Sequence, residues 1–139
     1  MNEQENGVSF FRFEDLRIYA KALDYIKWVQ KTSSFFATEH DKILREAFLK
    51  SAHAIALHIA EGSARNKAQF IYYLKMAKSS VRECVVFTEL SMETENFSET
   101  DKEYSRTQLM ELTKMIGSLV SSLQRAMPNS REDDIDEID

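Results

Sequence analysis

Five basic side chains lie in a stretch of the sequence that contains no acid. The stretch runs between Glu61 and Glu83, and its cations are Arg65, Lys67, Lys75, Lys78 and Arg82. The last three are three and four residues apart, so on a helix they share one face, and we expect all three to point to solvent. Such a strip suits phosphates or an acidic protein. The alternative is a solvated face without a partner, because exposed charges cost little free energy.

The residues that could support catalysis do not form a recognisable set. A di-iron helical bundle needs Glu-x-x-His on two helices, and none of the three histidines has a glutamate three residues before it. His58 is interpreted as a packed histidine, and Cys84 falls on an expected core face, which predicts an unreactive thiol. Along a helical hairpin, Glu61 and Glu83 would lie about 25 Å apart, too far to act on one substrate bond. We therefore expect no enzymatic activity, no metal, no cofactor and no small-molecule substrate.

The composition indicates a helical protein. The 139 residues include only three glycines, one proline and one cysteine, which favours helices and excludes an internal disulfide. No apolar run approaches the ~18 residues of a membrane span, and the acidic N-terminus is unlike a signal peptide, so we expect a cytoplasmic protein. The net charge of −5 comes mainly from residues 131–139, which hold six acids and one base.

The elements that must position the basic strip are four helices. Apolar periodicity predicts them at about residues 14–34, 39–61 and 67–95, followed by a seam through Leu109, Leu112, Ile116, Leu119 and Leu123 that Pro128 ends. Short connections predict an all-α, up-down-up-down four-helix bundle over residues 13–127. Residues 1–12 are expected to be an N-terminal arm, and residues 128–139 a disordered acidic tail that is dispensable for folding and screens the basic strip.

The turn between the second and third helices carries the most specific local signals. Gly62 is expected to end the second helix as a left-handed C′ residue, and Asn66 to cap the third. Glu61 lies beside the apolar stripe and needs a partner. The candidates are the backbone amides of residues 65–68, the Arg65 side chain, or a neighbouring subunit.

Three short patterns carry a resemblance to a known family. They are Phe13-Glu14-Asp15-Leu16, then Ile59-Ala60-Glu61-Gly62, then Phe70, Tyr73, Leu74, Ala77, Ser80 and Glu83 at their respective spacings. With them the chain, from Phe13 to about Leu123, resembles the bacterial four-helix-bundle proteins encoded in intervening sequences of 23S rRNA genes. That family includes the accessory proteins of diversity-generating retroelements.

The resemblance implies a left-handed bundle that often assembles into a homopentameric ring and has no enzymatic activity. In the retroelement branch it implies a strongly basic ring that binds a reverse transcriptase and nucleic acid, whereas this chain has a pI of about 5.3. Spare aromatic residues on and after a two-faced first helix, namely Trp28, Phe35 and Phe36, independently favour a homo-oligomer.

Two function classes follow. The first is an oligomeric adaptor or scaffold that assists a nucleic-acid enzyme. The second is a module that binds RNA or DNA directly through the basic half of the third helix.

Overall fold

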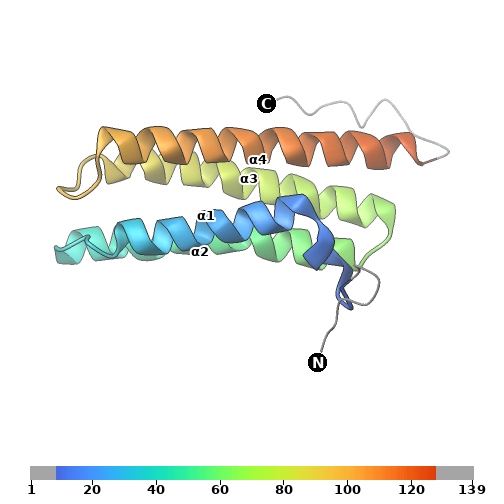
Figure 1. Ribbon diagram of the computed structural model, residues 1–139, viewed down its shortest axis with the longest axis horizontal. Helices are drawn as coiled ribbons and strands as arrows, with labels where there is room; N and C mark the ends of the chain where they lie inside the picture. Colours follow the sequence, from blue (N-terminus) through green and yellow to red (C-terminus); the bar gives the residue numbers. More distant parts are fainter. Residues whose placement is uncertain (1–8, 128–139) are drawn as a thin grey trace.

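The computed structural model describes residues 9–127, and within them four long helices form an antiparallel bundle (Figure 1). After a short 3-10 turn, Arg12–Asp15, come α1 (Arg17–Ser33), α2 (Glu39–Ser63), α3 (Lys67–Ser91) and α4 (Glu99–Arg125). Helix α1 packs on α2 and α4, and α3 packs on the same two helices, so α1 and α3 lie diagonally opposite each other. The predicted all-α four-helix bundle is confirmed. The arm before residue 9 and the acidic tail lie outside the described residues.

The core follows the apolar periodicity of the helices. Its fully buried aliphatic and aromatic side chains come from all four helices and include Ala22, Val29, Phe48, Ile55, Ile59, Leu74, Ala77, Val81, Leu109, Leu112 and Ile116. On α4 the predicted seam holds for its first three positions. It then moves to Val120, while Leu119 and Leu123 are only partly buried against it.

Side-chain caps fix where three of the helices begin. Asn66 accepts a hydrogen bond from the backbone amide of Gln69 at 2.9 Å, as predicted. Thr38 does the same for Asp41 at 3.0 Å. Ser98 accepts from the amide of Asp101 at 3.1 Å and its own amide donates to the Asp101 carboxylate, which completes a capping box. Each cap satisfies amides that have no partner within the helix.

Two predicted helix ends were wrong. Helix α1 begins at Arg17 rather than near residue 14, because Leu16 has an extended backbone with ψ of 130°. Asp15 therefore does not cap the first turn. Its carboxylate accepts hydrogen bonds from the backbone amide and the hydroxyl of Ser9, at 3.1 and 3.2 Å, and holds the incoming chain. Helix α3 ends at Ser91 rather than near residue 95, where the Thr94 hydroxyl donates to the Ser91 carbonyl at 2.7 Å.

A buried hydroxyl network joins three of the helices. The Ser105 hydroxyl of α4 lies 2.7 Å from both the Tyr25 hydroxyl of α1 and the Thr88 hydroxyl of α3. Burial raises the pKa of the Tyr25 phenol well above its usual value, so the phenol stays protonated. Since an unpaired hydroxyl would be costly in this core, the network fixes how the three helices are aligned along the bundle.

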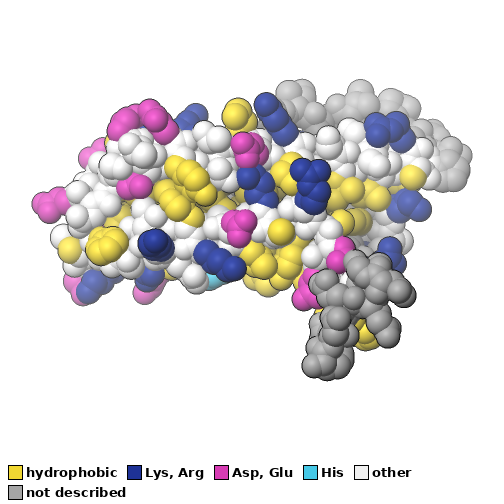
Figure 2. All heavy atoms as spheres, in the orientation of Figure 1, with side chains coloured by type: hydrophobic (Ala, Val, Ile, Leu, Met, Phe, Trp, Pro, Cys, Tyr) yellow, Lys and Arg dark blue, Asp and Glu magenta, His cyan; other side chains and the backbone are white. Residues whose placement is uncertain are grey.

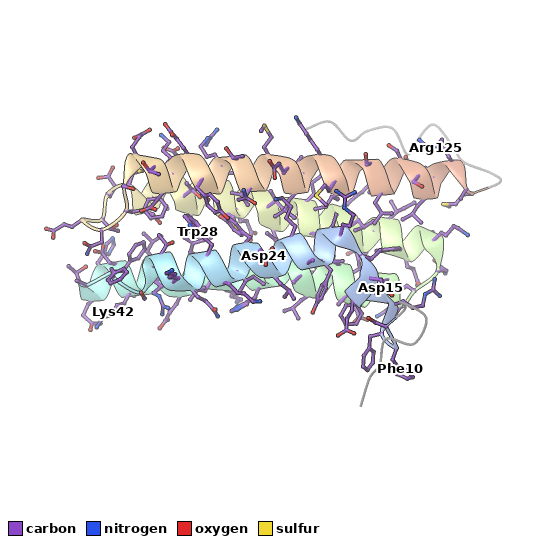
Figure 3. The ribbon with its side chains drawn as sticks, in the orientation of Figure 1. Phe10, Asp15, Asp24, Trp28, Lys42 and Arg125 are labelled. Atoms are coloured by element: carbon purple, nitrogen blue, oxygen red, sulfur yellow. The ribbon has the colours of Figure 1, made fainter. Side chains whose placement is uncertain are left out.

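The aromatic residues that suggested an interface are mostly covered by the chain itself. Trp28 lies between α1 and α4 (Figure 3), with ring centroids 5.8 Å from Tyr25 and 5.0 Å from Tyr104. Phe36 is buried against Phe97 at 6.3 Å. The two apolar faces of α1 therefore serve α2 and α4, and of the three spare aromatic residues only Phe35 is exposed, at 65%. The prediction that Trp28 and Phe36 are spare aromatic residues, left over for an oligomer interface, was wrong.

Candidate functional site

The predicted basic strip of α3 is not a continuous solvent-facing row. Lys78 is buried, with 8% of its surface exposed, Lys75 is half-buried and Arg82 is exposed. The expectation that all three point to solvent was therefore wrong. Lys78 lies one turn before Val81 and Arg82, on the flank of α3 that α4 covers. A lysine can bury its aliphatic stem in such a flank.

Arg65 is occupied within the turn between α2 and α3. Its guanidinium pairs with the Glu61 carboxylate, with the Nε atom 3.1 Å from Oε2, and lies 5.2 Å from the centre of the Tyr73 ring. The hydrogen bond to Glu61 raises the pKa of Arg65 above its usual value. Of the partners considered for Glu61, the structure shows Arg65. Glu61 itself is exposed rather than packed. Lys67 is exposed at the start of α3.

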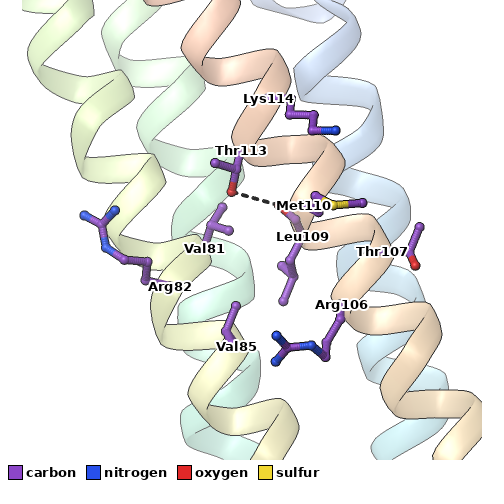
Figure 4. Close-up of a pocket in the computed structure, with 9 residues that line it drawn as sticks. All are labelled: Val81, Arg82, Val85, Arg106, Thr107, Leu109, Met110, Thr113 and Lys114. Carbon is purple, nitrogen blue, oxygen red and sulfur yellow. Dashed lines mark hydrogen bonds between the residues drawn. The ribbon is translucent and has the colours of Figure 1, made fainter. Parts of the chain in front are cut away.

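A groove between α3 and α4 brings together cations that are distant in the sequence (Figure 4). Its volume is about 470 Å³, and we call it the α3–α4 groove. Arg82 contributes from α3, and Arg106 and Lys114 from α4. Between them lies an apolar floor formed by Val81, Val85, Leu109 and Met110. The groove thus offers positive charge around a hydrophobic surface.

The neighbouring polar groups are largely engaged with one another. Glu89 of α3 pairs with Lys102 at 3.2 Å and with Arg106 at 3.6 Å, both on α4. Figure 4 shows Arg106 extending toward α3, with Val85 beside it. The Thr113 hydroxyl donates to the Leu109 carbonyl within α4 at 2.9 Å. Lys114, at the opposite end of the groove, is exposed.

A second furrow separates α1 from α4, which pack on each other less extensively than the other neighbouring helices. Hydrophobic side chains show through it between charged ones (Figure 2). Lys21 bridges the furrow, with its Nζ atom 2.6 Å from a Glu111 carboxylate oxygen and 2.7 Å from the Gln108 side-chain oxygen. An ion pair therefore bridges the furrow, which stays open beside it.

Gly62 brings α2 and α3 into close contact. A Cβ atom at this position would lie 2.6 Å from the Tyr73 Cβ and 2.9 Å from a Phe70 ring carbon. The glycine lies inside α2 rather than after it, and its φ is not in the left-handed region. The predicted role as a left-handed C′ residue was wrong. A glycine near the end of a helix can either end the helix in a left-handed conformation or allow a second helix to approach closely. The sequence alone does not distinguish these two roles, because the second depends on the position of α3.

The other residues that carried the resemblance hold the bundle together. Glu83 accepts a hydrogen bond from the Ser51 hydroxyl of α2 at 2.8 Å. Phe13 packs edge-on against Tyr19 with ring centroids 4.9 Å apart. Most of the others are buried or half-buried, among them Leu16, Ile59, Phe70, Leu74 and Ser80, whereas Glu14 and Asp15 are exposed. These patterns therefore specify packing of the helices and not a site for chemistry.

Glu61 and Glu83 are closer than the sequence suggested, yet still separate. Glu83 lies opposite Ser51, which is about 15 Å along α2 from Glu61. The estimate of 25 Å was too long, because Gly62 packs against Phe70 and Tyr73, so the first turn of α3 extends beyond the end of α2. A shared substrate bond needs carboxylates within about 10 Å of each other.

The remaining candidate groups are enclosed or unclustered. Cys84 is buried, and burial together with the nearby Glu83 charge raises the pKa of its thiol well above the usual value. The thiol therefore stays protonated and inaccessible. His58 is half-buried beside the Tyr73 ring. Across residues 9–127, no three His, Cys, Asp or Glu side chains converge in a way that could hold a metal ion. Over the same residues, no helix combines the length and hydrophobicity that crossing a bilayer requires.

Sequence reasoning missed an exposed apolar surface on α2 and α3. Ile43 and Leu57 of α2 are 67% and 66% exposed, and Tyr72, Val86 and Leu90 of α3 are 60%, 56% and 47% exposed. Spacings of seven residues, as from Tyr72 through Ser79 to Val86, return to nearly the same side of a helix and were the available signal.

These side chains lie on one side of the hairpin. Leu57 precedes His58, which contacts Tyr73, and Tyr72 precedes Tyr73 itself. Val86 likewise precedes Phe87, which packs against Phe48 of α2. Because the two helices are antiparallel, stepping back one residue turns the side chains of both to the same side. We call this surface the α2–α3 outer face.

Comparison with known proteins identifies the family and the fold. The model of the protein family described as "23S rRNA-intervening sequence protein" matches residues 14–118. A crystal structure of a protein of unknown function from the S23 ribosomal protein family of Bacteroides thetaiotaomicron has the same fold, with a TM-score of 0.68 and 22% sequence identity. The match covers 75% of this chain and 95% of that one. No curated protein matches.

Proposed function

The chain belongs to the 23S rRNA-intervening sequence protein family. We propose that it is a non-enzymatic scaffold that self-associates and acts as an adaptor for a nucleic-acid enzyme. This proposal is supported by the number of polar and reactive groups that are used for packing within the chain. The patterns of the resemblance hold α2 against α3, and the thiol and the hydroxyl network are buried. What remains at the surface is a set of faces suited to partners.

The observation that carries the proposal is the α2–α3 outer face. Five large apolar side chains on two antiparallel helices leave roughly half or more of their surface exposed. Exposed apolar side chains gathered on one side of a hairpin are typical of an interface, because burying them releases about 25 cal/mol for each Å². The spacing of fourteen residues from Ile43 to Leu57, and from Tyr72 to Val86, is two heptads, which matches packing against the helices of a second copy. A five-membered ring is the assembly that we propose, on the resemblance alone.

Thiol labelling of variants with one added cysteine tests whether this face is covered. The native Cys84 is buried and serves as an unreactive background. We expect Leu57→Cys to react with a maleimide roughly tenfold more slowly than Ala20→Cys on the exposed side of α1, which corresponds to about 1.4 kcal/mol of protection. In an isolated chain Leu57 is freely accessible, with 66% of its surface exposed. Equal labelling rates for the two variants, at micromolar concentration, would contradict the proposal.

Direct binding of RNA or DNA is the second candidate function. The observation that favours it is that Arg82, Arg106 and Lys114 all line the α3–α4 groove. If these cations contact phosphates, replacing all three with glutamine should lower the slope of log affinity against log salt by about one for each lost contact. Lys27→Gln, at an exposed position on α1, is the matched control. Binding with an unchanged salt slope in the triple variant would rule out this use of the groove.

A further inference from the structure

The α3–α4 groove has a chemical character that a bare phosphate chain does not match. Its floor is formed by Val81, Val85 and Leu109 together with Met110, which is 51% exposed. Phosphates would pair with the surrounding cations and leave this floor in contact with water. An occupant that combines carboxylates with aliphatic side chains would satisfy the charges and cover the floor together.

The chain contains one segment with that composition, and it lies outside the described residues. Residues 131–139 have the sequence REDDIDEID, with six carboxylates. Two isoleucines, Ile135 and Ile138, are the segment's only large apolar residues. The segment is thus acidic and aliphatic, whereas the groove is basic and aliphatic.

The segment is long enough to reach the groove of its own chain. Lys114 lies about 17 Å along α4 from Arg125, the last residue of that helix. Residue 131 can lie up to about 20 Å from Arg125 in an extended chain, and the nine residues from 131 onward span up to about 30 Å more. The distance from Lys114 to Arg106 is only about 12 Å.

The surface between the end of α4 and the groove is open. Gly117 lies one turn beyond Thr113 and Lys114, toward the end of α4. A Cβ atom added to Gly117 would meet no other atom within 4 Å. At Gly117, therefore, no side chain would stand in the way of a segment that returns along α4 to the groove.

We propose that residues 131–139 bind in the α3–α4 groove of their own chain, with their carboxylates near Arg82, Arg106 and Lys114 and their isoleucines on the apolar floor. Tethering makes even a weak contact effective, because a short linker gives an effective concentration in the millimolar range. The segment then competes with any other polyanion for the groove. The inference does not depend on self-association, and its test below reports on the groove and not on the α2–α3 outer face.

The methyl group of Met110 reports on the groove by NMR of the full chain labelled at its methionine methyl groups. Met92, just after the end of α3, is not among the residues that line the groove and serves as the reference. We compare the native chain with a variant of equal length in which the six acids of residues 131–139 are replaced by their amides. The chemical shift of the Met110 methyl group is expected to differ between the two proteins, while that of Met92 stays the same. Adding the native 131–139 peptide to the variant should restore the native chemical shift of Met110. An unchanged Met110 signal would overturn the proposal.

Charge variants of the bundle then separate a specific contact from general screening. In the amide variant, Lys114→Gln should lower the affinity for the added peptide roughly two- to fivefold, which is the effect expected for one exposed ion pair. Lys42→Gln, at an exposed position on α2, should leave its affinity unchanged. Equal weakening by both substitutions would overturn the assignment to the groove. A Met110 chemical shift in the native chain that depends on protein concentration would overturn the assignment of the segment to the groove of its own chain.

Discussion

Replacing Gly62 with alanine is expected to lower the free energy of unfolding by about 1–3 kcal/mol, the usual cost of overpacking a tightly packed contact. The added Cβ would lie 2.6 Å from the Tyr73 Cβ, which is bonded directly to the backbone of α3 and cannot move aside alone. The helices would have to separate locally, which would also disturb the contact with Phe70. The gain in helix propensity from glycine to alanine is smaller than this cost.

Gly117→Ala is the matched control, since this glycine also lies inside a long helix. Nothing lies within 4 Å of the added Cβ, so the substitution should raise stability by about 0.5–1 kcal/mol through helix propensity and loss of freedom in the unfolded chain. Denaturant unfolding of both variants at one protein concentration measures the difference. If both substitutions change the free energy of unfolding by a similar amount and in the same direction, α2 and α3 are not in close contact at Gly62.

Introducing glutamate at both Leu57 and Val86 is expected to dissociate the assembly. The two side chains are 66% and 56% exposed in the single chain, so the fold should keep its stability to within about 0.5 kcal/mol for each substitution. In an interface, each carboxylate would be buried without a partner, and each lost apolar side chain would remove about 1.5–3 kcal/mol of burial. Together these effects should weaken association by at least about a hundredfold.

Ala20→Glu adds the same kind of charge on the exposed side of α1 and should leave the assembly intact. Light scattering behind a sizing column compares the two variants, and circular dichroism checks that both are folded. If the double variant and the control elute with the same mass, the α2–α3 outer face is not the interface.

Local signals in the sequence were sufficient for the helices and much of the core. Apolar periodicity identified Leu109, Leu112 and Ile116 as core residues, and the capping preference of asparagine identified Asn66, because both signals depend on residues within one helix. The position of Lys78 could not be predicted in this way. Whether the flank of a helix is solvent or interface depends on where its neighbour packs, and α4 lies along that flank of α3.

The groove could not be predicted because its parts belong to different helices. Arg82 joins Arg106 and Lys114 only once α3 and α4 are aligned, and that alignment depends in part on the hydroxyls of Thr88 and Ser105. The α2–α3 outer face is a different case. Its seven-residue spacing was present in the sequence, but only the structure distinguishes an exposed apolar row from a core one.

The mass of the native protein in solution is the most direct test of whether the chain self-associates. Sedimentation equilibrium of the full-length protein over a range of micromolar concentrations measures this mass without an assumption about shape. Self-association predicts a whole-number multiple of the 16.2 kDa chain, fivefold for a ring, and a fall toward 16.2 kDa when both Leu57 and Val86 are replaced by glutamate. A mass of 16.2 kDa for the native chain at every concentration would contradict the proposal that this protein is a self-associating scaffold.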